Sequence, residues 1–286
     1  PMRPDAAAEQ LARELGAVFV LDGPQVLPAF APEAAVLLLR QQGPLRISGR
    51  PIMGAPVSSA GMEEAELCRL AACLHAGGTR TLGLGMSLGD LCMDEGFYPA
   101  VFAQLAAAAA RLREKSGLTA KIFDLGGGFG VSCRPDCPGP DLSACAEALR
   151  AQTCALPEAL QGVQLSMSPG RFLAAGGGVL VCRVVAVKPG PTAVLDVSAA
   201  QCLRLEKRGA YHAAAALRTA GRPPLLQQLT TLEQGAPFAR QVLPQLRAGD
   251  PVIIRMLGAD GRSFSCASER CPAYLLRADG TIEPIE

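Results

Sequence analysis

The chain has 286 residues, of which 49% are hydrophobic, so it can form one large globular domain or two domains of ordinary size. Its 27 basic and 26 acidic residues leave a net charge of +1 without a long run of one sign, which argues against nucleic acid or a membrane surface as a partner. No apolar stretch has the length of a membrane span, and we expect none.

The first part of the chain is predicted to alternate helices and strands, because apolar residues recur first at helical spacing and then in short runs. Gly16 and Gly117 follow two of the predicted helices, as helix-ending glycines do. In chain order we expect a helix over 4–16, a strand over 17–22, a short broken helix over 23–32, a strand over 33–41, a helix over 62–78, a strand over 79–86, a helix over 95–117, a strand over 120–130, a helix over 141–160 and a strand over 162–172. This alternation predicts βα units and a parallel sheet of five strands.

The pattern changes after residue 175 to strand following strand, with turns between them. Strands are expected over 176–190, 192–198, 250–257 and 272–280. The sequence therefore predicts an α/β domain over residues 1–175 and a mainly antiparallel β-domain over residues 176–286.

The eleven cysteines are scattered, and their number is odd. We interpret those in predicted elements as small buried side chains in an intracellular, reducing compartment, either the cytoplasm or an organelle such as the mitochondrion. They are Cys68, Cys73, Cys92, Cys145, Cys154 and Cys182. Two spaced pairs, Cys133 with Cys137 and Cys266 with Cys271, have no histidine nearby, so no metal site is expected.

The stretch "KIFDLGGGFG" carries the clearest chemical signal. A buried run ends at Asp124 and leads into Gly126, Gly127 and Gly128, and "SPGRF" with Gly170 and Arg171 follows about 40 residues later. Glycine lets backbone N–H groups approach an anion, and arginine offers a fork of donors. Tight turns between strands and helices also need glycine, so a purely structural role remains open.

The order of these motifs, followed by an all-β domain, resembles the pyridoxal-phosphate decarboxylases of the alanine-racemase-like fold, the ornithine and diaminopimelate decarboxylase family. "LGLGMSLGDLCMDEGFY" and "RPIMGAPVSSAGMEEAELCRLA" extend the resemblance, which favours the ornithine decarboxylase branch with its catalytically silent antizyme inhibitors. It implies a partial (βα) TIM-type barrel over 1–175 and a decarboxylase-type β-domain over 176–286. It also implies that a cofactor phosphate would be held by Gly126, Gly127, Gly128, Pro169, Gly170 and Arg171.

Several positions depart from the family pattern. Ser168 stands where the family has the acid that faces the pyridine nitrogen, Ser87 stands where it has the stacking histidine, and Asp90 places a negative charge beside the phosphate site. The family's Cys-Asp pair has no counterpart in residues 227–252, and Cys266 replaces a tyrosine that contacts the cofactor.

The Schiff-base lysine of the family would belong to barrel strands that precede this sequence. None of the four lysines is expected to replace it, because Lys121 precedes its strand and the others lie in a helix end or in the β-domain. These others are Lys115, Lys188 and Lys207.

These departures favour a non-catalytic decarboxylase-like protein, a pseudoenzyme without catalytic residues or a working cofactor, in which the phosphate cradle is vestigial. We expect it to serve as a structural or regulatory subunit, whose protein partner is a larger assembly or a decarboxylase homologue. An incomplete barrel would expose two sheet edges and an apolar inner face that a partner must cover.

Two alternatives stay open. The chain could be a pyridoxal-phosphate-dependent amino-acid decarboxylase whose lysine and first barrel half come from another chain or were removed. It could also bind a phosphorylated metabolite, although Asp90 opposes this.

Overall fold

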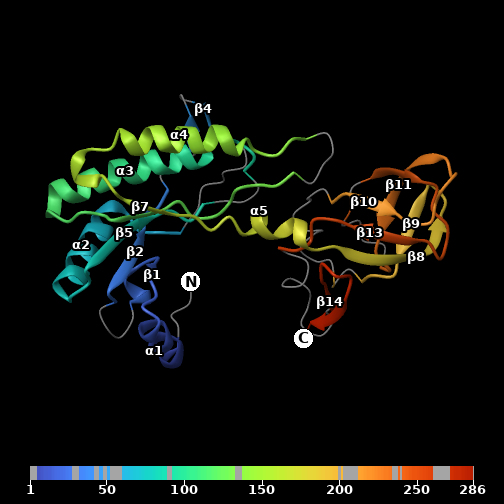
Figure 1. The fold of residues 1–286 in the computed structure, drawn as a ribbon, viewed down its shortest axis with the longest axis horizontal. Coiled ribbons are helices and arrows are strands. Elements are labelled where there is room, and N and C mark those ends of the chain that lie inside the picture. Colours follow the sequence, from blue (N-terminus) through green and yellow to red (C-terminus); the bar gives the residue numbers. More distant parts are fainter. Residues whose placement is uncertain are drawn as a thin grey trace. The chain divides into compact units, whose positions relative to one another are not determined.

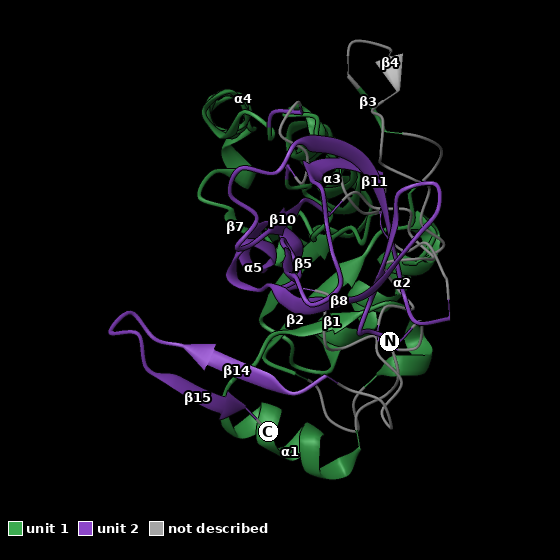
Figure 2. Cartoon of the chain, turned by 90° about the vertical axis from the view of Figure 1, so that its right-hand side faces the viewer, with its two compact units in different colours: residues 1–131, 139–170 green, residues 132–138, 171–286 purple. Residues whose placement is uncertain are grey.

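A computed structural model of the chain describes residues 5–27, 32–41, 45–47, 50–51, 60–88, 92–132, 137–198, 201, 212–233, 238, 240–259 and 271–285. The chain divides into two compact units (Figure 2). Unit 1 comprises residues 1–131 and 139–170, and unit 2 comprises residues 132–138 and 171–286. The main division therefore lies between Gly170 and Arg171, a few residues before the predicted boundary at 175.

Unit 1 is built on a parallel sheet with strand order β1-β2-β5-β6-β7 (Figure 1). Its strands are β1 (Phe19–Leu21), β2 (Ala34–Leu38), β5 (Thr81–Gly85), β6 (Ile122–Asp124) and β7 (Gln164–Ser166). Its helices are α1 (Ala6–Glu14), α2 (Glu64–Ala76), α3 (Phe97–Ser116) and α4 (Leu142–Cys154), with single 3₁₀ turns η1 (Pro24–Val26) and η2 (Glu158–Leu160). The predicted α/β class and the five parallel strands are confirmed.

One face of this sheet packs against helices. Leu37, Leu84 and Phe123 lie side by side in register on three neighbouring strands, and each is completely buried. The ring of Phe102 in α3 meets Phe123 edge-on, with 5.5 Å between ring centroids. Helix α3 thus anchors the centre of the sheet, which explains its long apolar run of sequence.

The opposite face is buried at its centre. Val36, Leu38 and Ile122 form a buried cluster and are 2%, 7% and 7% exposed. They meet across β5 because Gly83 has no side chain: a Cβ there would lie 2.8 Å from the Cβ of Ile122 and 2.9 Å from Cγ2 of Val36. The expected exposed apolar inner face is therefore wrong for this region, although Val20 at the β1 edge is 47% exposed.

Unit 2 contains a mixed, mostly antiparallel six-stranded sheet, with order β10-β13-β8-β9-β11-β12, and a separate hairpin. The sheet strands are β8 (Leu180–Lys188), β9 (Thr192–Leu195), β10 (Ala214–Ala216), β11 (Pro224–Thr230), β12 (Gln241–Pro244) and β13 (Pro251–Ile254). The hairpin pairs β14 (Ala273–Leu276) with β15 (Ile282–Ile285). Strands β9 and β11 are parallel neighbours, and inward-facing residues such as Val184, Leu195 and Val252 form a buried core.

Some predicted elements are corrected. The strand expected over 162–172 is confined to β7, because Gly170–Ala174 form a short helix, α5, followed by the 3₁₀ turn η3 (Ala175–Gly177). Pro169 directly precedes α5, in keeping with the preference of proline for helix starts. The apolar pattern of the sequence does not predict β10, β11, β12 or β15, nor the two-residue strands β3 (Arg46–Ile47) and β4 (Arg50–Pro51).

The prediction of buried cysteines is correct for Cys92, Cys145 and Cys182, but Cys73 and Cys154 are exposed and Cys68 is partly buried. Cys73 and Cys154 lie on helices, at positions that face away from the core, so their place in a regular element did not imply burial.

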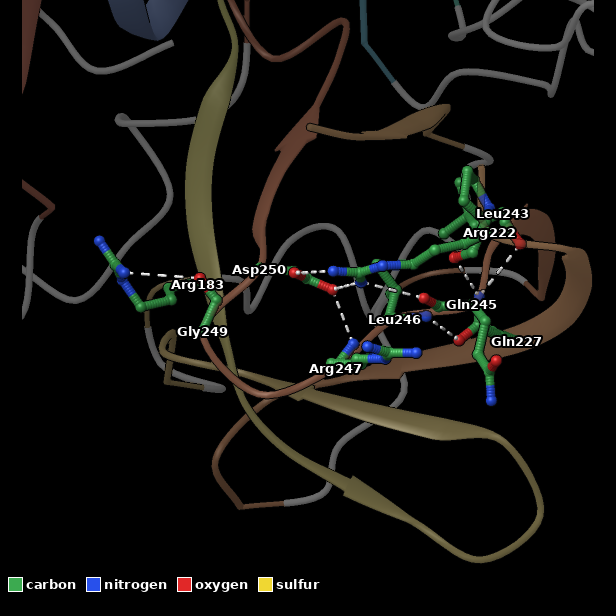
Figure 3. Close-up of polar contacts among 10 residues, drawn as sticks. Arg183, Arg222, Gln227, Leu243, Gln245, Leu246, Arg247, Gly249 and Asp250 are labelled. Carbon is green, nitrogen blue, oxygen red and sulfur yellow. Dashed lines mark hydrogen bonds and ion pairs between the residues drawn. The ribbon is translucent and has the colours of Figure 1, made fainter. Parts of the chain in front are cut away.

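A polar network fixes the turn between β12 and β13 (Figure 3). Arg222 forms a two-pronged ion pair with Asp250, whose carboxylate also accepts a hydrogen bond from the backbone N–H of Arg247 at 2.7 Å. Arg222 reaches the carbonyl of Gln245 as well, at 3.2 Å. The Arg222 guanidinium holds the pKa of Asp250 below its usual range.

Candidate functional site

The strands β5, β6 and β7 end at one edge of the unit 1 sheet, and their following loops are tied together by backbone hydrogen bonds. The N–H of Met86 donates to Asp124 at 3.1 Å, and the N–H of Leu125 donates to Ser166 at 2.8 Å. The N–H of Ser168 then donates to the carbonyl of Gly126 at 2.9 Å. The C-terminal edge of a parallel sheet is where α/β proteins commonly place their ligands, so this edge is the candidate site.

The packing of this edge itself requires glycine at two positions. Gly126 has a φ of +68°, and a Cβ there would overlap the carbonyl oxygen of Met86. A Cβ on Gly127 would lie 2.7 Å from the carbonyl oxygen of Ser168. The glycine run is therefore explained in part by the close approach of three loops, whatever it binds.

One backbone N–H group of the loop donates to a side chain, and two have no acceptor among the described residues. The N–H of Gly126 donates to Oδ1 of Asp124 at 3.0 Å, so this carboxylate caps its own loop. The N–H groups of Gly127 and Gly128 have no acceptor within the part of the chain that the structure describes. Two adjacent free amides could bind a phosphate oxygen.

The predicted cradle is only partly assembled within one unit. Gly126, Gly127 and Gly128 lie next to Ser168 in unit 1, as expected from parallel strands. Gly170 and Arg171 begin α5, and the division between the units falls between them, so Arg171 belongs to unit 2. A Cβ on Gly170 would meet nothing within 4 Å, unlike one on Gly126 or Gly127.

The positions that would face a cofactor ring carry short neutral side chains. Ser168 and Ser87 are both exposed at the C-terminal edge, and a hydroxyl cannot hold a pyridine nitrogen protonated as a carboxylate does. Asp90 and Cys266, the other two predicted departures, lie outside the described residues. In the 227–252 region, the carboxylate of Asp250 is already paired with Arg222.

The charged side chains that follow β1 and β2 form hydrogen bonds with backbone groups. Asp22, after β1, accepts a hydrogen bond from the N–H of Gly61, and Nε of Arg40, after β2, donates to the carbonyl of Gly61 at 2.9 Å. Gly61 has a φ of +95° and crosses close to the backbone of β2. These two charges hold a crossing segment in place and are not free for a ligand.

No lysine within the described ranges lies at this edge. Lys121 is exposed and directly precedes β6, at the opposite end of the sheet, and Lys115 at the end of α3 pairs with Glu64 at 2.8 Å. Lys188 ends β8 in unit 2, and Lys207 lies outside the described residues. The two histidines are also elsewhere, His75 in α2 and His212 in unit 2.

Sequence reasoning missed one residue of the site, Tyr98 in the first turn of α3. It is 2% exposed, and its hydroxyl lies 3.4 Å from the carbonyl oxygen of Gly126. Burial raises the pKa of Tyr98 to about 12. The signal that could have found it is the aromatic pair Phe97–Tyr98 at the start of the predicted helix.

The described part of the chain shows neither a metal-binding cluster nor a membrane-spanning helix. No cluster of three or more histidine, cysteine, aspartate or glutamate side chains is arranged there to hold a metal ion. None of the helices described there combines the length and apolar character that a bilayer crossing requires.

The sequence is similar to pyridoxal-dependent decarboxylases and to protein TabA. A family model described as "Pyridoxal-dependent decarboxylase, pyridoxal binding domain" matches residues 60–175, which include the glycine loop and the β7 turn. The chain is 29% identical over 283 residues to protein TabA of Pseudomonas amygdali pv. tabaci, covering 94% of this chain and 66% of TabA. It is 33% identical over 172 residues to the diaminopimelate decarboxylase of Campylobacter jejuni, covering 57% of this chain and 41% of that enzyme.

Solved structures share the fold over nearly the whole chain. A crystal structure of diaminopimelate decarboxylase matches with a TM-score of 0.75 and 21% identity, covering 98% of this chain and 72% of the other. A lysine/ornithine decarboxylase from Vibrio vulnificus, complexed with cadaverine, matches with a TM-score of 0.71 and 18% identity, covering 92% and 70%. The sheet of unit 1 and the β-domain of unit 2 are thus both found in these enzymes.

Proposed function

Because the chain is a relative of the ornithine and diaminopimelate decarboxylases, we propose that it is a non-catalytic member of that group, a pseudoenzyme that serves as a structural or regulatory subunit. One observation carries this proposal. Within the described ranges, the edge where β5, β6 and β7 end has no amine and no imidazole, and its carboxylate, Asp124, caps the glycine loop.

Chemistry with pyridoxal phosphate needs more than a phosphate site. The cofactor supplies an electron sink for a carbanion, but a lysine must carry its aldehyde, and in the decarboxylase family that the chain resembles an acid keeps its ring nitrogen protonated. The amides of Gly127 and Gly128 fit the phosphate end. Ser168 does not fit the ring nitrogen, and no described lysine fits the aldehyde, so these residues support no chemical step.

The partner side of the proposal rests on exposed apolar surface. Val18 and Val20 at the β1 edge are each 47% exposed. In unit 2, one face of the β14–β15 hairpin presents Tyr274, Leu276 and Ile282, which are 62%, 69% and 65% exposed. A two-stranded hairpin with a bare apolar face is marginally stable in water, so we propose that another protein covers such surfaces.

The same proposal keeps the protein in a reducing compartment, the cytoplasm or an organelle such as the mitochondrion. The eight cysteines that the structure describes are all free thiols, and three of them are exposed, which suits such a compartment.

A second candidate function is a pyridoxal-phosphate-dependent amino-acid decarboxylase that takes its lysine from another chain or from a further segment. The match to the pyridoxal binding domain and the two free amides of the loop favour this alternative. The chain spans 66% of TabA and 41% of the Campylobacter enzyme. The segment that carries the lysine would correspond to the part of these relatives that the chain does not match.

An adduct experiment separates the two. The purified protein is mixed with pyridoxal phosphate, its absorbance is recorded where an internal aldimine absorbs, and the sample is reduced with borohydride and analysed by peptide mass spectrometry. The Campylobacter diaminopimelate decarboxylase is the positive control. We expect no lysine modified stoichiometrically at one site. A single reduced adduct on one lysine would refute the pseudoenzyme proposal.

A further inference from the structure

An aromatic cluster lies directly beneath the glycine loop. The ring of Tyr98 packs against both Phe97 and Phe129, with centroid separations of 5.1 and 5.0 Å and interplanar angles of 51° and 49°. Phe97, Tyr98 and Phe129 are 0%, 2% and 4% exposed. The stack holds the Tyr98 ring in one orientation and excludes water from its hydroxyl.

Tyr98 contacts both ends of the glycine turn, Gly126 through its hydroxyl and Phe129 through its ring. The hydroxyl lies 3.4 Å from the carbonyl oxygen of Gly126, to which it can donate. Gly126 precedes the two free amides, and Phe129 follows them. Because burial raises the pKa of Tyr98 to about 12, the hydroxyl keeps its proton at any ordinary pH.

Other contacts hold the loop from its sides. The N–H of Ser168 donates to Gly126 at 2.9 Å, the N–H of Cys92 donates to Gly128 at 2.9 Å, and the N–H of Gly130 donates to Cys92 at 2.6 Å. The carbonyls of Gly126 and Gly128 thus accept hydrogen bonds, while the amides of Gly127 and Gly128 have no acceptor among the described residues. Such an arrangement presents donors in a fixed place without needing a ligand to order them.

We propose that Tyr98 is a positioning residue, whose hydroxyl donates to Gly126 while its ring packs on Phe129, and which fixes the shape of the Gly126–Gly128 loop before any anion arrives. This inference goes beyond the proposed function and does not depend on it. In a non-catalytic subunit the loop would hold the ends of β5, β6 and β7 together. In an enzyme the same preformed loop would bind a phosphate.

Amide hydrogen exchange of the intact protein tests the role of the hydroxyl. Tyr98→Phe keeps the ring and removes only the oxygen. We expect the N–H groups of Ser168 and Cys92, whose acceptors are Gly126 and Gly128, to exchange roughly two- to tenfold faster. The N–H of Leu39, bonded to Gly85 in the same sheet, serves as the reference and is expected not to change.

Two further variants separate positioning from general stability. Phe97→Leu loses part of the stack but keeps the hydroxyl, and it should speed exchange of the loop and reference amides alike. Tyr274→Phe makes the same substitution on the exposed hairpin, where the side chain is 62% exposed, and should change neither set. The proposal is overturned if Tyr98→Phe leaves the loop amides unchanged relative to Leu39, or if it speeds both sets equally.

Discussion

At the scale of single residues, the glycines of the candidate site fall into two groups: some lie where close packing leaves no room for a side chain, and others have room for one. Gly126 and Gly127 lie against the carbonyl oxygens of Met86 and Ser168, whereas Gly170 has open space around its Cα. If Gly126, Gly127 and Gly170 served only to bind a phosphate, substitution of any of them would weaken binding and none would change the stability of the fold.

We therefore predict that Gly126→Ala lowers the free energy of unfolding by about 2 kcal/mol or more, because the new methyl meets a backbone oxygen and the φ of +68° is unfavourable for alanine. Gly127→Ala should also destabilise the protein. Gly170→Ala is the matched control and should stay within about 0.5 kcal/mol of the parent. Urea unfolding measures all three, and equal losses for Gly126→Ala and Gly170→Ala would contradict this explanation.

The sequence revealed these glycines but not the reason for them. The pattern "DLGGGFG" indicated a turn at the end of a buried strand, and the structure confirms that β6 ends at Asp124. The backbone oxygens that exclude a side chain come from Met86 and Ser168, about 40 residues away on either side, and local sequence gives no sign of such contacts. Tyr98 was missed for the same reason, since a tyrosine in an apolar helix looks like ordinary core.

At the scale of elements, hydrophobic periodicity located the helices and parallel strands of unit 1 well and the strands of unit 2 poorly. Strands β2 and β5 are buried on both faces and read as continuous apolar runs. Strand β11 carries Gln227 and Gln228 between its leucines, and β10 consists of three alanines, so neither shows a clear apolar alternation. Gln227 is nevertheless 1% exposed, because its amide bonds the carbonyls of Leu243 and Pro244.

The turn between β12 and β13 gives a pH-dependent prediction. The pKa of Asp250 is lowered by Arg222, so its carboxylate stabilises the fold above its ordinary pKa near 4, and this contribution is lost as the pH falls toward the lower folded value. Asp250→Asn should cost about 2–4 kcal/mol at pH 7, because it leaves the guanidinium of Arg222 without its charged partner. The difference between variant and parent should shrink below pH 4.

Asp279→Asn is the control for that experiment. The pKa of Asp279 is also lowered, by a hydrogen bond from Thr281, but Asp279 lies in the exposed turn of the β14–β15 hairpin, and we expect little effect on unfolding. Urea titrations at pH 7 and pH 3 supply the comparison. An Asp250→Asn variant as stable as the parent at pH 7, or a difference that grows in acid, would show that the ion pair does not stabilise the turn.

At the scale of the whole molecule, the order of motifs identified the fold that the solved decarboxylase structures share with this chain. The expected exposed inner face is not found at the centre of the sheet, where Val36 and Ile122 approach each other across Gly83 and are both buried. Strand count describes how far a barrel extends, whereas side-chain volume decides whether a given part of its interior is covered.

We propose that this protein does not decarboxylate amino acids. The direct test is CO₂ release from L-ornithine, L-lysine and meso-diaminopimelate in the presence of pyridoxal phosphate, using the protein isolated from its natural source with any chain that co-purifies. A diaminopimelate decarboxylase is the positive control. We predict release at the level of the blank for all three substrates. Release that borohydride treatment abolishes would contradict the claim and would establish a working pyridoxal-phosphate site.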